Sequence, residues 1–500
     1  MVQEKAILVE ETLDPEDWES MRALGHRMVD DMLGYMKTVR ERPPWRHAPT
    51  EIKAHFSEPL PLDPQPPEEV YEEFLEYVLP YPVGNIHPRF WGWVAGTGTV
   101  FGALAELLAG SMNTLTTGGA YHSANYVEKQ VIDWIKEALR YPTSASGLLT
   151  SGCSAANLIG LAVARNTKAD CDLRREGIRA APYKMVLYAS DEVHSSVHKA
   201  AELLGLGRDA LRLIPVNDLF QIDLEALRAA IAQDRQDGHL PFCVVGAAGT
   251  TNTGAIDDLS ALADICQQEG LWLHVDGAFG AWAALVPSAR HLVAGMERAD
   301  SLALDLHKWM CMPYEIGCIL VRREDDHRKT FSSTAAYLAH GEGRRGLTGV
   351  DLPWFSDYGF QLSRGFRALK AWMSLKEHGA RKYGRLIQQN IDQARYLAER
   401  INAAPELELA APVTLNAVCF RYTRAGLDDA ALDELNKQIE VELQERGVAV
   451  PSVTTIRGKR VLHVDNTNHR SCREDFDILV REVIRIGEEL AQSSEAAIHL

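Results

Sequence analysis

Two residues of opposite charge, each at the end of an apolar segment, give the strongest chemical signal in this sequence. Asp276 ends the apolar segment 271–275, and Lys308 follows the apolar segment 301–304, 32 residues further on (308 minus 276). A lysine amine can form an imine with the aldehyde of pyridoxal phosphate (PLP), and an aspartate can keep the pyridine nitrogen protonated, so that the ring accepts electrons. The pair therefore predicts a PLP site.

A turn rich in small residues, 150–157, follows an expected strand and opens an expected helix at 158–164. Small residues there let backbone N–H groups and hydroxyls approach a phosphate at the positive end of the helix. The turn lacks the GxxxxGK and GxGxxG patterns, and Ala156 replaces the last glycine of a GxSxG elbow. Such turns also close ordinary strand–helix junctions, so this one indicates a site only together with the other motifs.

Further segments after expected strands carry side chains suited to a flat cofactor. His194, in segment 190–196, could stack on a ring, and the hydroxyl-rich turn 249–254 could bind oxygens. Ala278 is small enough to let a ring lie flat, and His307 could donate to a phosphate. Most of these residues have a structural alternative. His194 could be a loop histidine bonded by the serines, the turn 249–254 could cap a helix, and His307 could belong to a surface dipeptide. Asp276 could form a structural ion pair. Because open α/β sheets bind ligands outside the carboxyl ends of their strands, the whole series favours one shared site.

The elements expected to position these residues alternate between helices and short apolar strands. Such a pattern predicts an α/β domain with a mostly parallel, buried sheet. The expected strands are 147–151, 184–188, 242–246, 271–275, 301–304 and 317–321. Two later strands, 416–422 and 460–464, and a final apolar helix predict a small α+β domain at the C-terminus.

The first ninety residues differ from the rest of the chain. Apolar residues recur at helical spacing from Trp18 to Met36, and a proline-rich connector follows between Pro43 and Pro67. The apolar face of this helix packs either within the chain or on a second subunit. We therefore expect three parts: a helical and extended dimer-wrapping segment (1–90), a PLP-binding large domain (91–390) and a small domain (391–500).

Composition limits the classes of partner. The formal net charge is −17, which argues against binding to nucleic acid or to an anionic membrane surface. No segment approaches the ~20 apolar residues that cross a bilayer. Eight scattered cysteines without a CxxC pair are typical of free thiols in a reducing compartment. We expect a cytoplasmic protein, and no motif indicates a metal site.

Together these motifs resemble the group II PLP-dependent decarboxylases, which act on aromatic amino acids, histidine, tyrosine and glutamate. The resemblance extends from about residue 84 to residue 379 and is specific for the family rather than for one substrate. It rests on His87-Pro88-Arg89-Phe90, Glu128, Asp133-Trp134, the turn 150–157, His194-Ser195-Ser196, Gly249-Thr250-Thr251, His274-Val275-Asp276, His307-Lys308-Trp309 and the segment 363–370.

The resemblance implies a fold type I architecture and an obligate homodimer with active sites at the interface. It implies that Lys308 is the Schiff-base lysine, Asp276 the pyridinium partner and His194 the stacking residue. It also implies a set of cofactor contacts, Cys153 and Ser154 largely through their backbone, together with Thr251, Ala278, His307 and Asp305. Asp305 stands where many eukaryotic members have asparagine, and Gly277 replaces an alanine; neither change removes a catalytic role.

A tyrosine on a mobile loop is credited in animal relatives with protonating the reacting carbon. Tyr337, 29 residues after Lys308 (337 minus 308), falls at the matching place, and Tyr358 is a weaker candidate. Relatives with phenylalanine there are aldehyde synthases, so Tyr337 together with His194 favours an amine product. The register slips by a few residues when it is counted back from Phe366, so the loop is longer here.

The resemblance also places a substrate pocket after His87. Trp91 and Trp93 in that segment favour an aromatic amino acid over glutamate, although large aromatic residues are usually core or dimer contacts. Ser363 lies where enzymes for phenolic and indolic substrates differ, and a serine there weakly favours phenylalanine or tyrosine as the substrate.

Four alternatives stay open: oxidative decarboxylation to an aromatic acetaldehyde, decarboxylation of a non-aromatic amino acid, another PLP reaction such as transamination or C–S cleavage, and a PLP-free homologue that serves in binding or oligomerisation.

Overall fold

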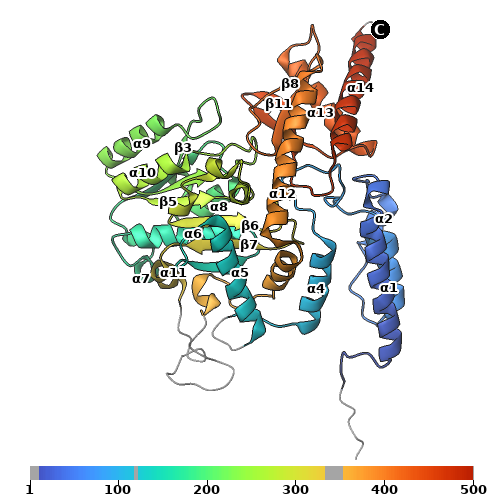
Figure 1. Cartoon of the computed structure of the whole chain (residues 1–500), viewed down its shortest axis with the longest axis horizontal. Coiled ribbons are helices and arrows are strands. Elements are labelled where there is room, and N and C mark those ends of the chain that lie inside the picture. Colours follow the sequence, from blue (N-terminus) through green and yellow to red (C-terminus); the bar gives the residue numbers. More distant parts are fainter. Residues whose placement is uncertain (1–10, 118–121, 333–352, 499–500) are drawn as a thin grey trace, which may run out of the picture.

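A large mixed sheet forms the centre of the molecule. The computed structural model describes residues 11–117, 122–332 and 353–498. Its large sheet contains β1 (Ser146–Thr150), β2 (Met185–Ser190), β3 (Leu211–Ile214), β4 (Leu240–Ala247), β5 (Trp272–Asp276), β6 (Ser301–Asp305) and β7 (Gly317–Val321). The strand order is β1-β7-β6-β5-β4-β2-β3, and β5, β6 and β7 lie between the surrounding helices (Figure 1). Only β7 runs antiparallel to its neighbours, so the predicted α/β fold with a mostly parallel sheet is confirmed.

Helices cover both faces of this sheet. On β4, Gly246 faces the leucines of α10, whereas His274 on β5 faces Gly160 of α6 on the opposite side. The strands are buried along nearly their whole length, as expected for a sheet covered twice. The helices of this domain are α5 (Ser123–Leu139), α6 (Cys153–Lys168), α7 (Leu173–Glu176), α8 (Ser195–Leu203), α9 (Leu224–Gln236), α10 (Leu259–Glu269) and α11 (Glu324–Phe331).

A second, smaller sheet lies near the C-terminus. Its strands β8 (Leu407–Leu409), β9 (Ala417–Tyr422), β10 (Ser452–Ile456) and β11 (Lys459–Asp465) are antiparallel and lie in the order β10-β11-β9-β8. Helices α13 (Asp429–Glu445) and α14 (Arg473–Ile498) pack on it around a separate apolar core. The long helix α12 (Ala368–Asn402), kinked at Gly379, connects the two sheets and runs through the expected domain boundary at residue 390.

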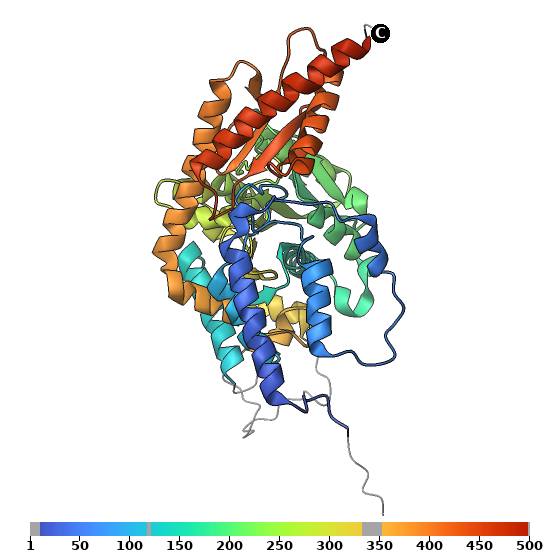
Figure 2. The ribbon, with the colours of Figure 1, turned by 90° about the vertical axis from the view of Figure 1, so that its right-hand side faces the viewer.

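The N-terminal helices lie outside the large sheet. They are α1 (Trp18–Lys37), α2 (Thr50–His55), α3 (Pro67–Glu73) and α4 (Val100–Met112). The side chain of Asp17 caps α1, and α1 lies at the outside of the molecule in both views (Figure 1 and Figure 2). Arg40 ties this segment to Asp475 at the start of α14. Within the described ranges, no helix combines the length and the apolar character needed to cross a membrane.

Candidate active site

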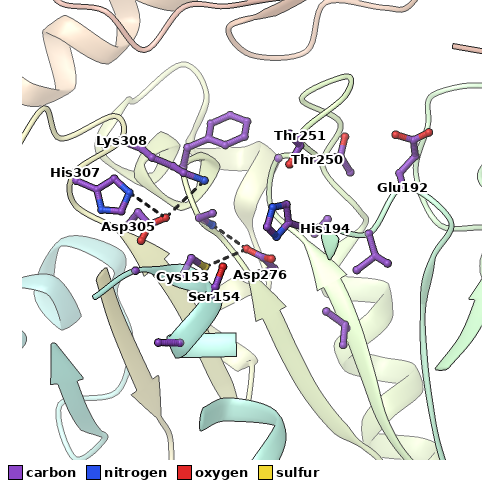
Figure 3. A pocket seen from close by; sticks show the side chains of 18 of the residues that line it. Cys153, Ser154, Glu192, His194, Thr250, Thr251, Asp276, Asp305, His307 and Lys308 are labelled. Carbon is purple, nitrogen blue, oxygen red and sulfur yellow. Dashed lines mark hydrogen bonds and ion pairs between the residues drawn. The ribbon is translucent and has the colours of Figure 1, made fainter. Parts of the chain in front are cut away.

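A cavity of about 330 Å³ opens at the carboxyl ends of β4, β5 and β6 (Figure 3). This is the edge of an open α/β sheet where ligands bind. The structure brings together at this cavity every expected cofactor contact that lies in the described residues. These are Cys153, Ser154, His194, Thr251, Asp276, Ala278, Asp305, His307 and Lys308.

Asp276, the last residue of β5, has a carboxylate surrounded by donors. Oδ1 accepts from the backbone N–H of Ala278 at 3.1 Å and from the Cys153 thiol at 3.3 Å, and Oδ2 accepts from Asn157 Nδ2 at 2.8 Å. These donors are neutral, and a buried carboxylate is costly without a cationic partner. A protonated pyridine nitrogen would provide that partner.

Lys308 lies beside a second carboxylate, that of Asp305 at the end of β6. Its Nζ is 3.6 Å from Asp305 Oδ2, and His307 Nε2 is also 3.6 Å from that oxygen. Burial raises the pKa of Asp305 to about 6, although the charge of Lys308 opposes this shift. Burial acts to lower the pKa of Lys308, but nearby acidic groups, Asp305 first, outweigh it and the net shift is upward. The amine is therefore held as an ammonium in the cofactor-free chain.

His194 caps the N-terminus of α8. Its Nδ1 accepts from the backbone N–H of Ser196 at 3.2 Å and lies 2.8 Å from Ser196 Oγ. Burial lowers the pKa of His194, so the ring is neutral at neutral pH. A neutral aromatic ring at the cavity wall is suited to stacking on a flat cofactor.

The start of α6 provides the phosphate end of the cavity. The helix spans 16 residues and has no side-chain cap, so its first N–H groups and its dipole favour an anion. A Cβ at Gly317 would lie 2.7 Å from the backbone of Gly152, so the turn before α6 can approach β7 this closely because residue 317 is a glycine. Together with Asp276 and Lys308, this arrangement fits PLP, since it pairs an anion-binding end with an acid and an amine.

The four expected substrate contacts do not line this cavity in the single chain. Trp91 stacks on Phe476 with 4.9 Å between ring centroids, and its Nε1 donates to Ser471 Oγ. It is therefore a core residue at the small domain, the alternative that the sequence had left open. Ser363 is exposed, Trp93 is 65% exposed, and His87 lies in a different hollow beside Gly84.

The two tyrosine candidates also differ in position. Tyr337 lies outside the described residues. Tyr358 is buried, and its hydroxyl donates to Glu324 at 2.5 Å beside α11, where it does not line the cavity. Tyr358 therefore has a structural role.

Sequence reasoning missed three polar residues at or behind the cavity: Asn157, Ser196 and Glu192. Asn157 and Ser196 bond to Asp276 and His194 respectively, and Glu192 lines the wall and accepts from Asn252 Nδ2 at 2.9 Å. Asn157 lies one helical turn after Cys153, so the spacing i, i+4 was the signal that could have placed both on one side of α6. No comparable sequence signal marks Glu192.

Comparisons with known proteins agree with this site. The family described as "Pyridoxal-dependent decarboxylase conserved domain" matches residues 49–423. An aromatic-L-amino-acid decarboxylase from Bacillus atrophaeus is 34% identical over 483 residues, which cover 95% of this chain and 97% of that protein. A phenylacetaldehyde synthase from Arabidopsis thaliana is 28% identical over 484 residues, which cover 94% of this chain and 97% of that protein. The crystal structure of Oryza sativa TDC with PLP and tryptamine superposes with a TM-score of 0.87 at 25% identity, over 96% of this chain and 100% of that chain.

The fold and the site thus define a PLP-dependent enzyme of fold type I. The chain belongs to the pyridoxal-dependent decarboxylase family, and it is a PLP-dependent amino-acid decarboxylase. Family membership disfavours two of the open alternatives, the PLP-free homologue and the transaminase or C–S lyase.

Proposed function

We propose that this enzyme converts an aromatic L-amino acid to its amine and carbon dioxide. The observation that carries the chemistry is the convergence of Asp276, Lys308 and the start of α6 on one cavity. The aromatic substrate class is supported by the similarity to the Bacillus atrophaeus enzyme over nearly the whole of both chains.

Each residue has a defined task in this proposal. PLP, when bound, accepts the electrons of the broken bond. Lys308 would hold the cofactor through its amine, and Asp276 would keep the ring nitrogen protonated. The neutral His194 ring would cover one face of the cofactor, and the small Ala278 side chain would leave room for the cofactor ring to lie flat. Donors at the start of α6, with Ser154, Thr251 and His307, bind the phosphate and ring substituents.

Tyr337 is proposed as the acid that protonates the reacting carbon. The support is its position 29 residues after Lys308 (337 minus 308). A phenol at this point delivers a proton before oxygen can react, which favours amine over aldehyde. The Tyr337→Phe variant should therefore lose amine formation and gain aldehyde with peroxide. Amine production at the parent rate would show that another group is the donor.

We further propose a homodimer in which each cavity is completed by the partner. Large apolar side chains are exposed on α4, including Leu107 (53%) and Leu108 (47%), and on α1, including Trp18 (65%). Large apolar side chains left exposed on two helices are typical of an interface. In such a dimer the exposed Trp93 and Ser363 would contact substrate from across the interface, whereas His87, which is buried in its own chain, would support the segment that carries Trp93.

A cytoplasmic location is the last part of the proposal. All eight cysteines lie in the described residues, and none forms a disulfide. Free thiols in this number are typical of a reducing compartment.

The deciding experiment is a substrate panel of phenylalanine, tyrosine, tryptophan, histidine and glutamate with the PLP-loaded enzyme. Carbon dioxide, amine, aldehyde and peroxide are followed together. We expect kcat/KM for the best aromatic substrate to exceed that for glutamate by at least about 100-fold, with amine matching carbon dioxide. A preference for glutamate would overturn the aromatic assignment, and peroxide in step with carbon dioxide would replace the amine product by an aldehyde.

A further inference from the structure

A continuous network of buried hydrogen bonds runs behind the cavity and joins its two principal cofactor contacts. Asn157, buried on α6, is the junction. Its Nδ2 donates to Asp276 Oδ2 at 2.8 Å and to Ser196 Oγ at 2.9 Å. Its Oδ1 lies 2.9 Å from His274 Nε2. One amide side chain therefore contacts three polar groups, two of them on β5 and one on α8.

The carboxylate of Asp276 fixes the orientation of this amide. An ionised carboxylate only accepts hydrogen bonds, so the NH₂ group of Asn157 must face it and the carbonyl oxygen must face His274. His274 Nε2 must then carry a proton. Burial lowers the pKa of His274 to about 4, so the ring is neutral and its Nδ1 carries none.

The far side of the network holds the amide in that orientation. Ser301 Oγ, 2.7 Å from His274 Nδ1, donates to this nitrogen, and Trp272 Nε1 donates to Ser301 Oγ at 2.8 Å. An indole N–H can only donate. Each group from Trp272 through Ser301, His274 and Asn157 therefore donates to the next, and the last hydrogen bond ends at Asp276. A Cβ at Gly160 would lie 2.6 Å from the His274 ring, so α6 packs closely against this residue.

The same amide orders the environment of His194. Ser196 Oγ accepts from Asn157, so its own proton is free for His194 Nδ1 at 2.8 Å. The backbone N–H of Ser196 donates to the same nitrogen. With two donors at Nδ1, the neutral His194 ring carries its proton on Nε2.

We propose that Asn157 is a positioning residue that orients Asp276 and His194 through two branches of one hydrogen-bond network. The inference rests on the proposed roles of those two residues toward PLP. One branch holds the Asp276 carboxylate in place for a ring nitrogen, and the other sets the donors at His194 Nδ1. Loss of Asn157 disturbs both branches, whereas loss of the Ser196 hydroxyl disturbs only the second.

The test compares Asn157→Leu, Ser196→Ala and Ser301→Ala by two measurements that need no amino-acid substrate. The first is the dissociation constant for PLP of the cofactor-free protein. The second is the ¹⁵N spectrum of histidine-labelled, cofactor-free protein, in which the His194 Nδ1 signal is assigned by its absence in His194→Gln. Asn436→Leu is the matched control, because Asn436 is also a buried amide with three hydrogen bonds, but in the small domain.

Asn157→Leu should weaken PLP binding about 10- to 100-fold, because it removes a charge-assisted hydrogen bond, and should shift the Nδ1 signal. Ser196→Ala should shift the signal while PLP binding changes less than about threefold. Ser301→Ala should weaken PLP binding by a few-fold. The control should leave both readouts unchanged even where it lowers stability.

PLP binding within twofold of the parent in Asn157→Leu, or an unmoved Nδ1 signal, would overturn the proposal. If Asn157→Leu does not fold, Ser196→Ala decides: an unmoved signal, or a loss of PLP affinity as large as tenfold, contradicts two separable branches. Failure of the aromatic substrate panel would leave these results unaffected, so the two proposals fail independently.

Discussion

The carboxyl edge of the large sheet and the faces of α1 and α4 are built in opposite ways. At the sheet edge, polar side chains are buried and mostly paired, as in the network of Asp276, Asn157 and His194. On α1 and α4, large apolar side chains such as Trp18 and Leu107 are exposed. Burying a polar group is costly unless it forms hydrogen bonds, and large exposed apolar patches are typical of interfaces. The first region therefore pairs most of its polar groups within one chain, whereas the second leaves apolar surface exposed.

This difference separates the cofactor chemistry from the assembly. The residues proposed to hold PLP come from one chain. The expected substrate contacts at Trp93 and Ser363 lie on exposed surface, so their role depends on the partner. Changes at the sheet edge should therefore affect cofactor binding or stability directly, whereas changes on α4 should act through the oligomer.

The largest effect should follow removal of the reacting amine. Lys308→Ala should lower the rate of decarboxylation more than about 10³-fold and abolish the absorbance at about 420 nm, because the amine that links the protein to the cofactor is gone. Activity and the absorption spectrum measure this. Lys437→Ala, a change at an exposed lysine of α13, should leave both as in the parent, and a persistent 420 nm band in Lys308→Ala would place the linkage elsewhere.

The second-largest effect should follow the introduction of charge on the exposed apolar face of α4. In the Leu107→Glu, Leu108→Glu double variant, two carboxylates must be buried at the proposed interface, at a cost of several kcal/mol. Light scattering should give the monomer mass, and activity should fall at least about 100-fold. Leu203→Glu tests exposure alone, since Leu203 is 74% exposed on α8, away from α4. A double variant that remains an active dimer would exclude this face as the interface.

The buried ion pair of Glu128 and Arg364 should show how strongly the large domain depends on paired charges. Arg364 donates to both carboxylate oxygens, at 2.6 and 3.1 Å, and also to the carbonyl of Leu149 on β1. Glu128→Gln should lower the free energy of unfolding by about 3–5 kcal/mol, because it leaves a buried guanidinium without its counter-charge.

Denaturant unfolding measures this change. The exposed pair of Arg208 and Glu202 is the matched comparison, and Glu202→Gln should cost no more than about 1 kcal/mol. Equal effects at the two sites would mean that burial adds nothing to the pairing.

Asp465 is one of several buried residues with an unpartnered polar atom, and its replacement should give the smallest effect. Among the described residues, its Oδ2 has no hydrogen-bond partner, and burial raises its pKa to about 7. A raised carboxyl pKa means that ionisation of Asp465 destabilises the folded state. This loss of stability is absent below about pH 4, where the carboxyl is protonated in both the folded and the unfolded chain, and is complete above about pH 7.

In the cofactor-free protein, Asp465→Asn should therefore be more stable than the parent by about 1–3 kcal/mol near pH 8 and equal to it near pH 4. Unfolding at both pH values measures the difference. A gain that is the same at both would contradict ionisation as its cause.

The reach of the sequence is clearest where chemistry coincides with the end of a strand. Asp276 and Lys308 were predicted because an apolar strand followed by a charged residue places that residue at the sheet edge, whatever the details of packing. Trp91 and Trp93 show the limit. They lie two positions apart in one segment, yet Trp91 is buried against Phe476 and Trp93 is exposed, because the small domain covers one and not the other.

The sequence by itself determined the α/β fold with its mostly parallel sheet, the PLP chemistry, and the cofactor contacts expected at the ends of strands, since these depend on residue type and on position relative to a strand. Only the tertiary structure decided which polar groups bond to one another. Asn157, His274 and Ser301 lie far apart along the chain, and their hydrogen bonds exist because α6 packs against β5 and β6. Periodicity within one segment specifies which side of a helix or strand is buried. Which side chain of another element contacts that side is set by how the elements pack.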